Sequence, residues 1–411
     1  MLEWGGVADD FTGATDLATN WRARGLRVAV LLGSEHSVAE LTDADAAVIA
    51  LKSRTAPPAD AVRDSLEAAR LLRNAGARRI YDKYCSTFDS TPDGNIGPVL
   101  DALAVELGSD RTVVVPAFPD AGRTVYQRRL FVFDELLETS HMRHHPLTPM
   151  TRSDVVTLLA EQSERPVTGI PWVTVQRGSA AIRAAIDAAP AGSHVVVDAL
   201  SNADLGAIAE ATENDPLVSG GSGLALGLPW RETDATPMPV IAGFRAVLAG
   251  SASRATQSQV AHALGELPAQ QFDTAALAID IDSEVARLTE WAVRQWADAP
   301  EQPVLVYATG VPADVGTGAH AELIERANAE LAVKFAEHGM RQLLVAGGET
   351  SGAVMARMGV KRLDLGDPVA AGLSWALGRA EACGSEPVNL LLKSGNFGDA
   401  DLFTSAWEQL R

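Results

Sequence analysis

The sequence of 411 residues has no apolar stretch long enough to cross a membrane as a helix. Residues Met1 to Gly13 also lack the basic start and the apolar run of a secretion signal. These absences argue against a helical membrane protein and against export by such a signal. The cytoplasm is therefore the expected location.

Cysteine is scarce, with only Cys85 and Cys383 in the whole chain. Two cysteines cannot form a disulfide framework, and neither has a CxxC partner or another zinc-type spacing. Both are predicted to be reduced thiols. Because no general base stands near Cys85 in the sequence, a covalent role for its thiol is disfavoured.

Positive charge is also limited, since 34 Lys and Arg face 53 Asp and Glu, for a formal net charge of −19. Such a surface repels nucleic acid and anionic membranes, so small molecules are the expected partners. The GxxxxGK[ST] motif is absent, which excludes the P-loop class. Anionic ligands would need local pockets built from a few Lys and Arg and from backbone N–H groups.

Short β-branched apolar runs alternate with amphipathic segments along the whole chain. Strands are expected at 4–8, 27–32, 46–51, 79–81, 112–115, 195–198, 244–248, 304–307, 342–345 and 388–392. Helices are expected at 13–24, 59–74, 96–107, 203–212, 283–297, 319–337 and 400–410. This alternation predicts the α/β class, with two α/β domains whose mostly parallel sheets are flanked by helices.

The proline-containing charged segment 231–239 (RETDATPMP) is typical of an interdomain linker. We therefore expect domains at 1–230 and 231–411. The segment 116–149 carries no clear periodicity and is expected to be irregular.

Paired carboxylates, Asp9 and Asp10, follow the first expected strand and precede a helix. Ligands of open α/β sheets bind at the carboxyl ends of strands, so one of the two could act as a general base on a hydroxyl. The competing interpretation is that one aspartate caps the helix and the other is solvated.

Two further polar segments follow expected strands and are candidates for binding an acid or a polyol. Lys52, Ser53 and Arg54 could hold a carboxylate, with Arg able to bind it through parallel N–H bonds. The later segment, 83–97, offers many short hydrogen-bonding side chains, namely Ser86, Thr87, Ser90 and Thr91. An exposed polar loop and a plain serine-rich turn remain the alternatives.

Glycine-rich turns gather late in the chain, at 220–223, 250–256, 346–352 and 393–398. A strand, a glycine turn and a helix in succession let backbone N–H groups approach phosphate oxygens. We expect a nucleotide at these turns. The candidate contacts are Ser251, Ser253, Gly347, Gly348, Glu349, Thr350, Lys393 and Gly395.

Two other patterns are weaker. The GxGxxA match at 316–321 lies far from the preceding strand and lacks the acidic residue that a dinucleotide site requires. His141, His144 and His145 have metal-compatible spacing but no obvious carboxylate set around them, so no metal site is assigned to them and their role stays open.

Several of these segments together resemble a known family. They are ADDFTGATD (8–16), ALKSRT (50–55), KYCSTFDSTPDGNIGP (83–98), PAFPDAGRTVYQ (116–127), MRHHPLTPM (142–150), GGSGLA (220–225) and KSGNFG (393–398). In this order they resemble the four-carbon acid sugar kinase family. The KYCSTFDSTP form is similar to the 3-oxo-tetronate kinase branch, whereas threonate and erythronate kinases more often carry a DSTLRGN-like form.

The resemblance implies a sugar-acid-binding N-terminal domain, an ATP-binding C-terminal domain, an active site in the interdomain cleft and phosphorylation of a C4 hydroxyl. It places Asp9 and Asp10 at the substrate and Ser253, Gly347 to Thr350 and Gly395 at the nucleotide. The sequence departs from the family pattern at 2–6 and at Arg128 and Arg129, where a Gly-His-like pair is expected.

For a kinase we expect Asp10, or less favourably Asp9, to accept the hydroxyl proton. ATP is the expected phosphoryl donor. Mg²⁺ is expected to be held through waters, with Glu349 as a candidate contact. A sugar-acid lyase and a nucleotide-sensing protein remain alternatives. The sequence leaves open the acid and its stereochemistry, and it also leaves a homodimer open.

Overall fold

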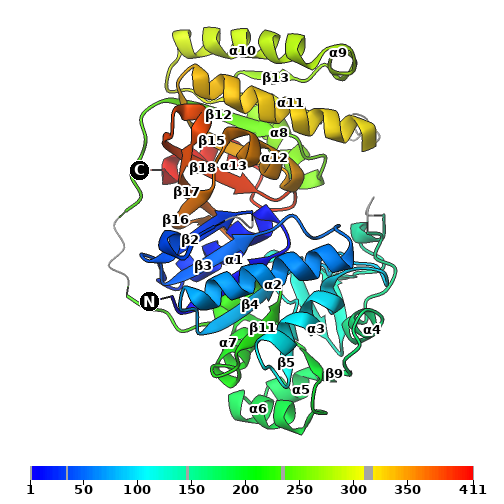
Figure 1. The fold of residues 1–411 in the computed structure, drawn as a ribbon. Coiled ribbons are helices and arrows are strands. Elements are labelled where there is room, and N and C mark those ends of the chain that lie inside the picture. The colour runs from blue at the N-terminus through cyan, green and yellow to red at the C-terminus, as the bar shows by residue number, and fades with distance from the viewer. Residues whose placement is uncertain (1, 34–35, 145–147, 233–236, 310–317, 411) are drawn as a thin grey trace. The chain divides into compact units, whose positions relative to one another are not determined.

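The computed structural model describes residues 2–33, 36–144, 148–232, 237–309 and 318–410 (Figure 1). The chain divides into two compact units, Met1–Ala235 and Thr236–Arg411. Each unit is an α/β structure built on its own run of strands, and each is described by itself.

The N-terminal unit is built on parallel strands in the order β2-β3-β1-β4-β11-β5-β10-β9. Their bounds are β1 Trp4–Ala8, β2 Val28–Leu32, β3 Ala46–Ala50, β4 Arg79–Lys83, β5 Thr112–Val115, β9 Val167–Ile170, β10 His194–Val197 and β11 Leu217–Gly220. The central strands are buried along their whole length, which explains why the sequence shows continuous apolar runs there.

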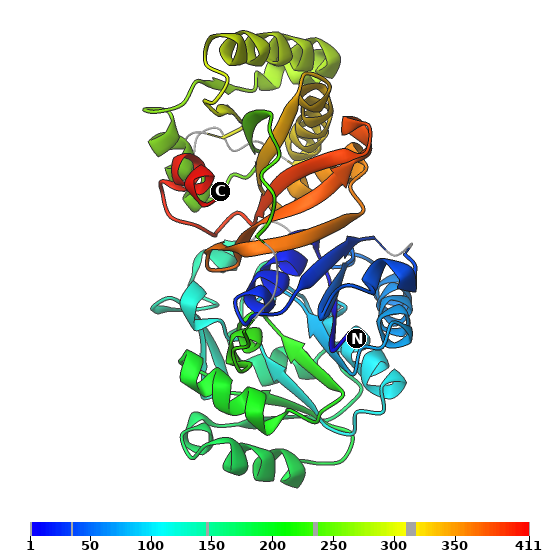
Figure 2. The same cartoon turned by 90° about the vertical axis from the view of Figure 1, so that its left-hand side faces the viewer.

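Helices cover both faces of this sheet, because strand order reverses on either side of β1 and parallel crossovers are right-handed. They are α1 Phe11–Arg22, α2 Pro58–Asn74, α3 Ile96–Glu106, α4 Val155–Ala160, α5 Trp172–Val175, α6 Ser179–Ala188 and α7 Asn202–Ala211. Helices α2 and α3 pack side by side over one face (Figure 1), and α6 packs against α7 on the other (Figure 2).

The segment expected to be irregular contains a small antiparallel sheet, so that prediction was wrong. Its strands are β6 Arg123–Tyr126, β7 Arg129–Val132 and β8 Glu135–Leu136. Gln127 and Arg128 form the β6–β7 turn with positive φ angles of 48° and 67°. Their backbone N–H groups donate to the Asp198 carboxylate at 2.7 and 2.9 Å, which fixes this sheet to the end of β10.

The C-terminal unit has the strand order β13-β14-β12-β15-β18-β17-β16. The bounds are β12 Phe244–Ala249, β13 Ala269–Gln271, β14 Val304–Tyr307, β15 Met340–Ala346, β16 Arg362–Ala370, β17 Leu373–Ala380 and β18 Glu386–Lys393. Pairing is parallel from β13 to β18 and antiparallel for the β16–β17 hairpin and its contact with β18. The prediction of mostly parallel α/β sheets is confirmed, although the β16–β17 hairpin was not among the strands predicted from the sequence.

The helices of this unit are α8 Arg254–Ala263, α9 Thr274–Ile279, α10 Ile281–Asp298, α11 Gly318–Glu337, α12 Gly348–Met358 and α13 Leu402–Ser405. Helix α11 packs against α9, α10 and α12, whereas α13 packs against α8. Among the residues that the structure describes, no helix has the length and apolar character that a membrane span requires.

The C-terminal segment closes the core of this unit. Phe403 is fully buried in a cluster with Val247, Leu344 and Trp375. The Trp375 indole N–H donates to the Ala406 carbonyl at 2.9 Å. The helix expected at 400–410 is therefore interrupted at this point, since α13 ends at Ser405 and a 3₁₀ turn follows.

Replacing Phe403 by Ala should destabilise the C-terminal unit by about 3–5 kcal/mol, because a fully buried aromatic ring leaves a cavity that cannot collapse completely. The free energy of unfolding in urea measures this cost. The exposed Glu408 on the same segment supplies a matched control, and Glu408→Ala should change stability by no more than about 0.5 kcal/mol. Equal stabilities for the two variants would contradict the packing described here.

Candidate active site

Polar side chains of the N-terminal unit gather at the carboxyl edge of its sheet. Because the strand pairs are parallel, the residues that follow β1, β3, β4 and β11 meet at one edge. The sequence-predicted aspartates follow β1, the Lys52 to Arg54 turn follows β3 and the polar loop 84–95 follows β4. This edge is the candidate substrate site.

Arg54 lies between the two aspartates. Its Nε and Nη2 donate to the Asp9 carboxylate at 2.8 Å each, and Nη2 also lies 2.7 Å from Asp10 Oδ1. The side chains of Asp9, Asp10 and Arg54 are 15%, 20% and 26% exposed, so a small ligand can reach them. The structure therefore brings together three of the residues singled out from the sequence.

Asp10 is also the N-cap of α1. Its Oδ1 accepts the Gly13 N–H at 2.8 Å and its Oδ2 accepts the Thr12 hydroxyl at 2.9 Å. The capping interpretation offered by the sequence is thus correct for Asp10. Asp9, by contrast, has no recorded side-chain hydrogen bond within the described residues other than those from Arg54.

The two aspartates differ in pKa because their surroundings differ. Burial raises the pKa of Asp9, and this effect outweighs the attraction of Arg54. Burial acts in the same direction on Asp10. There the charges of Arg54 and Lys83 and the hydrogen bonds from Thr12 and Gly13 together prevail, so the pKa of Asp10 is lowered. Asp9 is the stronger proton acceptor of the pair.

Sequence reasoning did not assign Lys83 and Asp16 to the site, although both lie beside it. Lys83 Nζ donates to the Tyr84 carbonyl at 3.0 Å and lies 3.8 Å from Asp16 Oδ2. A Cβ on Gly13 would lie 2.3 Å from Asp10 Oδ1 and 3.1 Å from Lys83 Nζ. The close approach of Asp10 and Lys83 therefore requires a glycine at this position. This glycine in the DDFTG segment was the signal in the sequence from which that approach could have been inferred.

The loop after β4 has an inner and an outer set of hydroxyls. Thr87 is buried and donates to Asp89 at 2.6 Å, and the buried Ser90 accepts from Gln162 at 3.0 Å. Ser86 and Thr91 are partly exposed. The contacts of Thr87 and Ser90 with substrate stay predictions. Their hydrogen bonds with Asp89 and Gln162 hold the shape of the loop.

The turn after β3 is tied to this loop through Asn95, whose Nδ2 donates to the Ser53 carbonyl at 2.7 Å. Ser53 is buried, whereas the neighbouring Lys52 is exposed. Of the predicted acid-binding residues, Lys52 is therefore the one whose side chain lies at the surface.

Three of the four expected glycine turns belong to the C-terminal unit and follow β12, β15 and β18, which are neighbouring parallel strands. The fourth, at 220–223, follows β11 in the N-terminal unit, so it does not join the other three. A Cβ on Gly250 or Gly347 would lie 2.3 or 2.8 Å from Thr350 Oγ1, and a Cβ on Gly395 would lie 2.8 Å from Ser251 Oγ. A side chain at any of these three glycines would therefore collide with Thr350 or Ser251. Helix α12 begins here at Gly348, and its N-cap Gly347 has no side-chain hydrogen bond to offer.

The other predicted nucleotide contacts are distributed around these turns. Ser253 caps α8 by accepting the Thr256 N–H at 3.2 Å, and it also donates to the Gly395 carbonyl. Lys393 is fully buried, and its Nζ donates to Thr256 Oγ1 and to the Gly395 carbonyl at 2.8 Å each. Burial lowers the pKa of Lys393 to about 7. Its ammonium therefore binds the turn rather than facing the surface.

Within the described ranges, no cluster of three or more His, Cys, Asp or Glu could hold a metal ion. Glu349 is exposed at the start of α12. His145, the side chain of His144 and Gly316 of the GxGxxA match lie outside the described residues, and Gly318 of that match begins α11.

Comparison with known proteins agrees with the division of the chain into two units. Residues 4–228 match the model of a sugar-binding N-terminal domain, and residues 246–403 match that of a nucleotide-binding C-terminal domain. A 3-oxo-tetronate kinase from Pseudomonas fluorescens is 44% identical over 99% of this chain and 96% of its own length. One from Salmonella typhimurium is 37% identical, with 100% of both chains covered.

Solved structures show the same architecture. A Salmonella typhimurium LT2 protein is 37% identical with a TM-score of 0.89, covering 100% of both chains. A Haemophilus influenzae protein is 35% identical with a TM-score of 0.78, covering 99% of this chain and 100% of its own.

The fold and the two family models define a protein in which a sugar-binding domain precedes a nucleotide-binding domain. The chain belongs to the four-carbon acid sugar kinase family, and the resemblance drawn from its motifs is confirmed.

A buried carboxyl under the substrate site should make stability depend on pH. Burial raises the pKa of Asp82 to about 7, although Ser219 donates to it at 2.8 Å. The folded protein therefore holds a proton that the unfolded chain loses near pH 4, and stability falls as pH rises from about 4 to about 7.

Replacing Asp82 by Asn should remove this dependence, so the variant gains stability relative to the natural protein across that window, by up to about 4 kcal/mol. Urea unfolding at pH 5, 6, 7 and 8 measures the difference. Glu67→Gln, on the exposed surface of α2, is the charge-neutralising control. A difference that does not change with pH would show that Asp82 is ionised throughout.

Proposed function

We propose that this protein is an ATP-dependent phosphotransferase that phosphorylates the C4 hydroxyl of 3-oxo-tetronate. The observation that carries the proposal is the Asp9–Arg54–Asp10 cluster at the carboxyl edge of a sugar-binding domain. An alcohol acceptor requires a carboxylate to receive its proton, and an anionic sugar acid requires that nearby negative charge be neutralised.

Arg54 meets the second requirement, because it offsets the charges of both aspartates. The exposed Lys52 supplies the cation that we assign to the substrate carboxylate. Ser53, Ser86, Thr87, Ser90 and Thr91 complete the proposed substrate site, with the partly exposed Ser86 and Thr91 as direct contacts and the buried members shaping the loop.

Asp9 is the proposed general base. The sequence favoured Asp10, but its oxygens cap α1 and its pKa is lowered, whereas burial raises the pKa of Asp9. Asp10 then acts by fixing the start of α1 and the orientation of Arg54. Phosphoryl transfer needs little more from the protein than alignment and charge stabilisation.

The glycine turns of the C-terminal unit fit the triphosphate of ATP. A Cβ at Gly250, Gly347 or Gly395 would fill the space beside Thr350 and Ser251, and the start of α12 presents backbone N–H groups. Ser251, Ser253 and Gly347 to Thr350 are the proposed contacts, and Lys393 holds the turn of Gly395 in place.

Magnesium bound to ATP would neutralise charge on the phosphate oxygens. Glu349 is the exposed carboxylate that would hold the ion through water. ATP as donor, together with two free thiols, favours a cytoplasmic setting.

The direct test is ADP formation over a panel of oxidised and unoxidised four-carbon acids. We expect turnover with a 3-oxo-tetronate and much less with threonate or erythronate. Preference for an unoxidised acid would reassign the substrate. Heat stabilisation by ATP without any ADP release would indicate a nucleotide sensor, and acid consumption without ATP would indicate a lyase.

Replacing Asp9 by Asn should lower kcat by about 10²-fold or more, because the hydroxyl proton loses its acceptor, while the Kd for ATP stays unchanged. Asn is an effective helix cap, so Asp10→Asn should fold normally and retain more turnover. ADP release and ATP titration measure the two effects. The reverse ranking of the two variants would identify Asp10 as the base.

Replacing Gly347 by Ala should raise the Kd for ATP at least about tenfold, since Gly347 has a φ of 129° and a Cβ would lie 2.8 Å from Thr350 Oγ1. Calorimetric titration of ATP measures this. Gly384→Ala is the matched control, because that glycine also has a positive φ, 67°, but its Cβ would meet nothing within 4 Å. Equal affinities for both variants would remove this turn from the nucleotide site.

A further inference from the structure

A second pocket of the N-terminal unit lies at the opposite, amino edge of the sheet. It has a volume of about 600 Å³, which is within the usual range for metabolite sites. Its walls include the first residues of β1 and β4 and parts of α7 and of the segment after it. Its lining residues include Trp4, Arg24, Arg78, Arg79, Gly206 and Leu228.

This pocket is separate from the candidate substrate site. Trp4 begins β1 and Asp9 follows its end, so the two residues lie about 16 Å apart along the strand. A small molecule in the pocket cannot touch the Asp9–Arg54–Asp10 cluster. Any ligand bound there is therefore something other than the sugar acid undergoing reaction.

The pocket contains positive charge that the described protein does not satisfy. Arg231 pairs with Glu3 at 2.7 Å, and Arg79 stacks over the Trp4 ring at 3.9 Å. The guanidinium groups of Arg24 and Arg78, by contrast, have no recorded ion pair or hydrogen bond with described residues. The Arg24 Nε is buried without a partner there.

Acidic side chains limit how much negative charge the pocket can accept. The exposed carboxylates of Glu210 and Glu213 also line it. A highly charged anion would be repelled by them, whereas a singly charged one can bind at Arg24 and Arg78. This balance favours a monoanion.

An adjoining recess provides an unused hydrogen-bond donor. It has a volume of about 10 Å³ and is lined by Trp4, Trp21, Tyr81 and Leu224, with Trp4 shared with the pocket. Trp21 is fully buried, and its indole N–H has no acceptor among the described residues. Buried indole N–H groups usually have a partner, and the recess has room for about one acceptor group or water.

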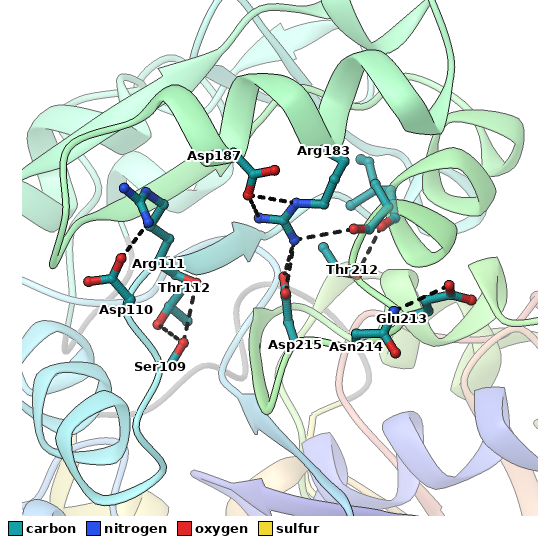
Figure 3. Close-up of polar contacts among 12 residues, drawn as sticks. Ser109, Asp110, Arg111, Thr112, Arg183, Asp187, Thr212, Glu213, Asn214 and Asp215 are labelled. Atoms are coloured by element: carbon teal, nitrogen blue, oxygen red, sulfur yellow. Dashed lines mark hydrogen bonds and ion pairs between the residues drawn. The ribbon is translucent and has the colours of Figure 1, made fainter.

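The walls are held in place before any ligand binds. Arg183 contacts both Asp187 and Asp215, as Figure 3 shows. Arg79 donates to the carbonyls of Thr212 and Asp215 from the other side. The loop that carries Glu213 and Asn214 is therefore fixed at both ends, and binding would require little rearrangement.

We propose that this pocket binds a small organic monoanion with a flat apolar body. Arg24 and Arg78 hold its charged group, and the flat apolar body packs against Leu228 and the Arg79 guanidinium that covers the Trp4 ring. The Trp21 indole N–H in the recess donates a hydrogen bond to an acceptor atom of the ligand or to a water bound with it. The proposal does not depend on the kinase activity, because its test uses neither turnover nor the sugar acid.

The probe is 8-anilinonaphthalene-1-sulfonate, a monoanion with an aromatic body, followed by fluorescence titration of the full-length protein. We expect saturable binding that excess ATP does not displace. Displacement by ATP would place the probe in the nucleotide site, and a lack of saturable binding would also overturn the proposal.

Gly206→Leu tests the location. A Cβ on Gly206 meets nothing closer than the Gly227 carbonyl at 4.0 Å, so a leucine enters the pocket without displacing backbone. Leucine also favours the α7 helix more than glycine does, so Tm should not fall. Probe affinity should drop at least about tenfold, whereas Gly206→Ala should retain most of it. Unchanged affinity in Gly206→Leu would overturn the proposal.

Arg78→Gln tests the charge. Arg78 is exposed and has no recorded side-chain partner among the described residues, so this variant should fold normally even if the leucine variant does not. Its affinity for the probe should fall several-fold. Arg63→Gln, on α2, is the matched control and should bind as the natural protein does. Equal affinities of the two arginine variants would contradict the proposal.

Discussion

The neutralisation of Asp9 and Asp10 by Arg54 is the interaction on which the substrate edge depends. Two adjacent carboxylates with little exposure would repel each other and any anionic ligand, unless a cation lay between them. The backbone places that cation, because the N–H groups of Ser53 and Arg54 donate to the Asp9 carbonyl at 3.0 and 3.1 Å. The ends of β1 and β3 are thereby joined, and Asn95 adds the loop after β4.

The two units share the same arrangement of strand ends but differ in the groups that this arrangement presents. In each, neighbouring parallel strands end at one edge and lead into turns and helices. In the N-terminal unit the turns carry charged side chains, and glycine serves to let Asp10 and Lys83 approach. In the C-terminal unit the glycines leave space beside Thr350 and Ser251, where we propose that backbone groups bind a phosphate chain. Side chains can position a proton acceptor, whereas backbone donors suit an anion whose contacts are spread over several oxygens.

The sequence predicted much of the fold, because buried parallel strands appear as continuous apolar runs: β1 and β5 have the expected bounds. It missed the β6–β7 hairpin, whose turn is Gln127 and Arg128 rather than a glycine-containing pair. At the site, strand ends predicted the meeting of Asp9, Asp10 and Arg54. The burial of Lys393 and the place of Lys83 could not be predicted, since each depends on packing between a strand and a helix that is distant in the sequence.

Acid binding depends on Arg54, because its charge offsets those of Asp9 and Asp10 beside the proposed substrate site. Binding of the acceptor acid should therefore fail when that charge is removed, while the nucleotide site is unaffected. Calorimetric titration of 3-oxo-tetronate and of ATP into the natural protein and Arg54→Gln measures both affinities most directly. We predict that acid binding is lost and that the Kd for ATP is unchanged. Acid binding of equal affinity in Arg54→Gln would contradict the central role of the Asp9–Arg54–Asp10 cluster.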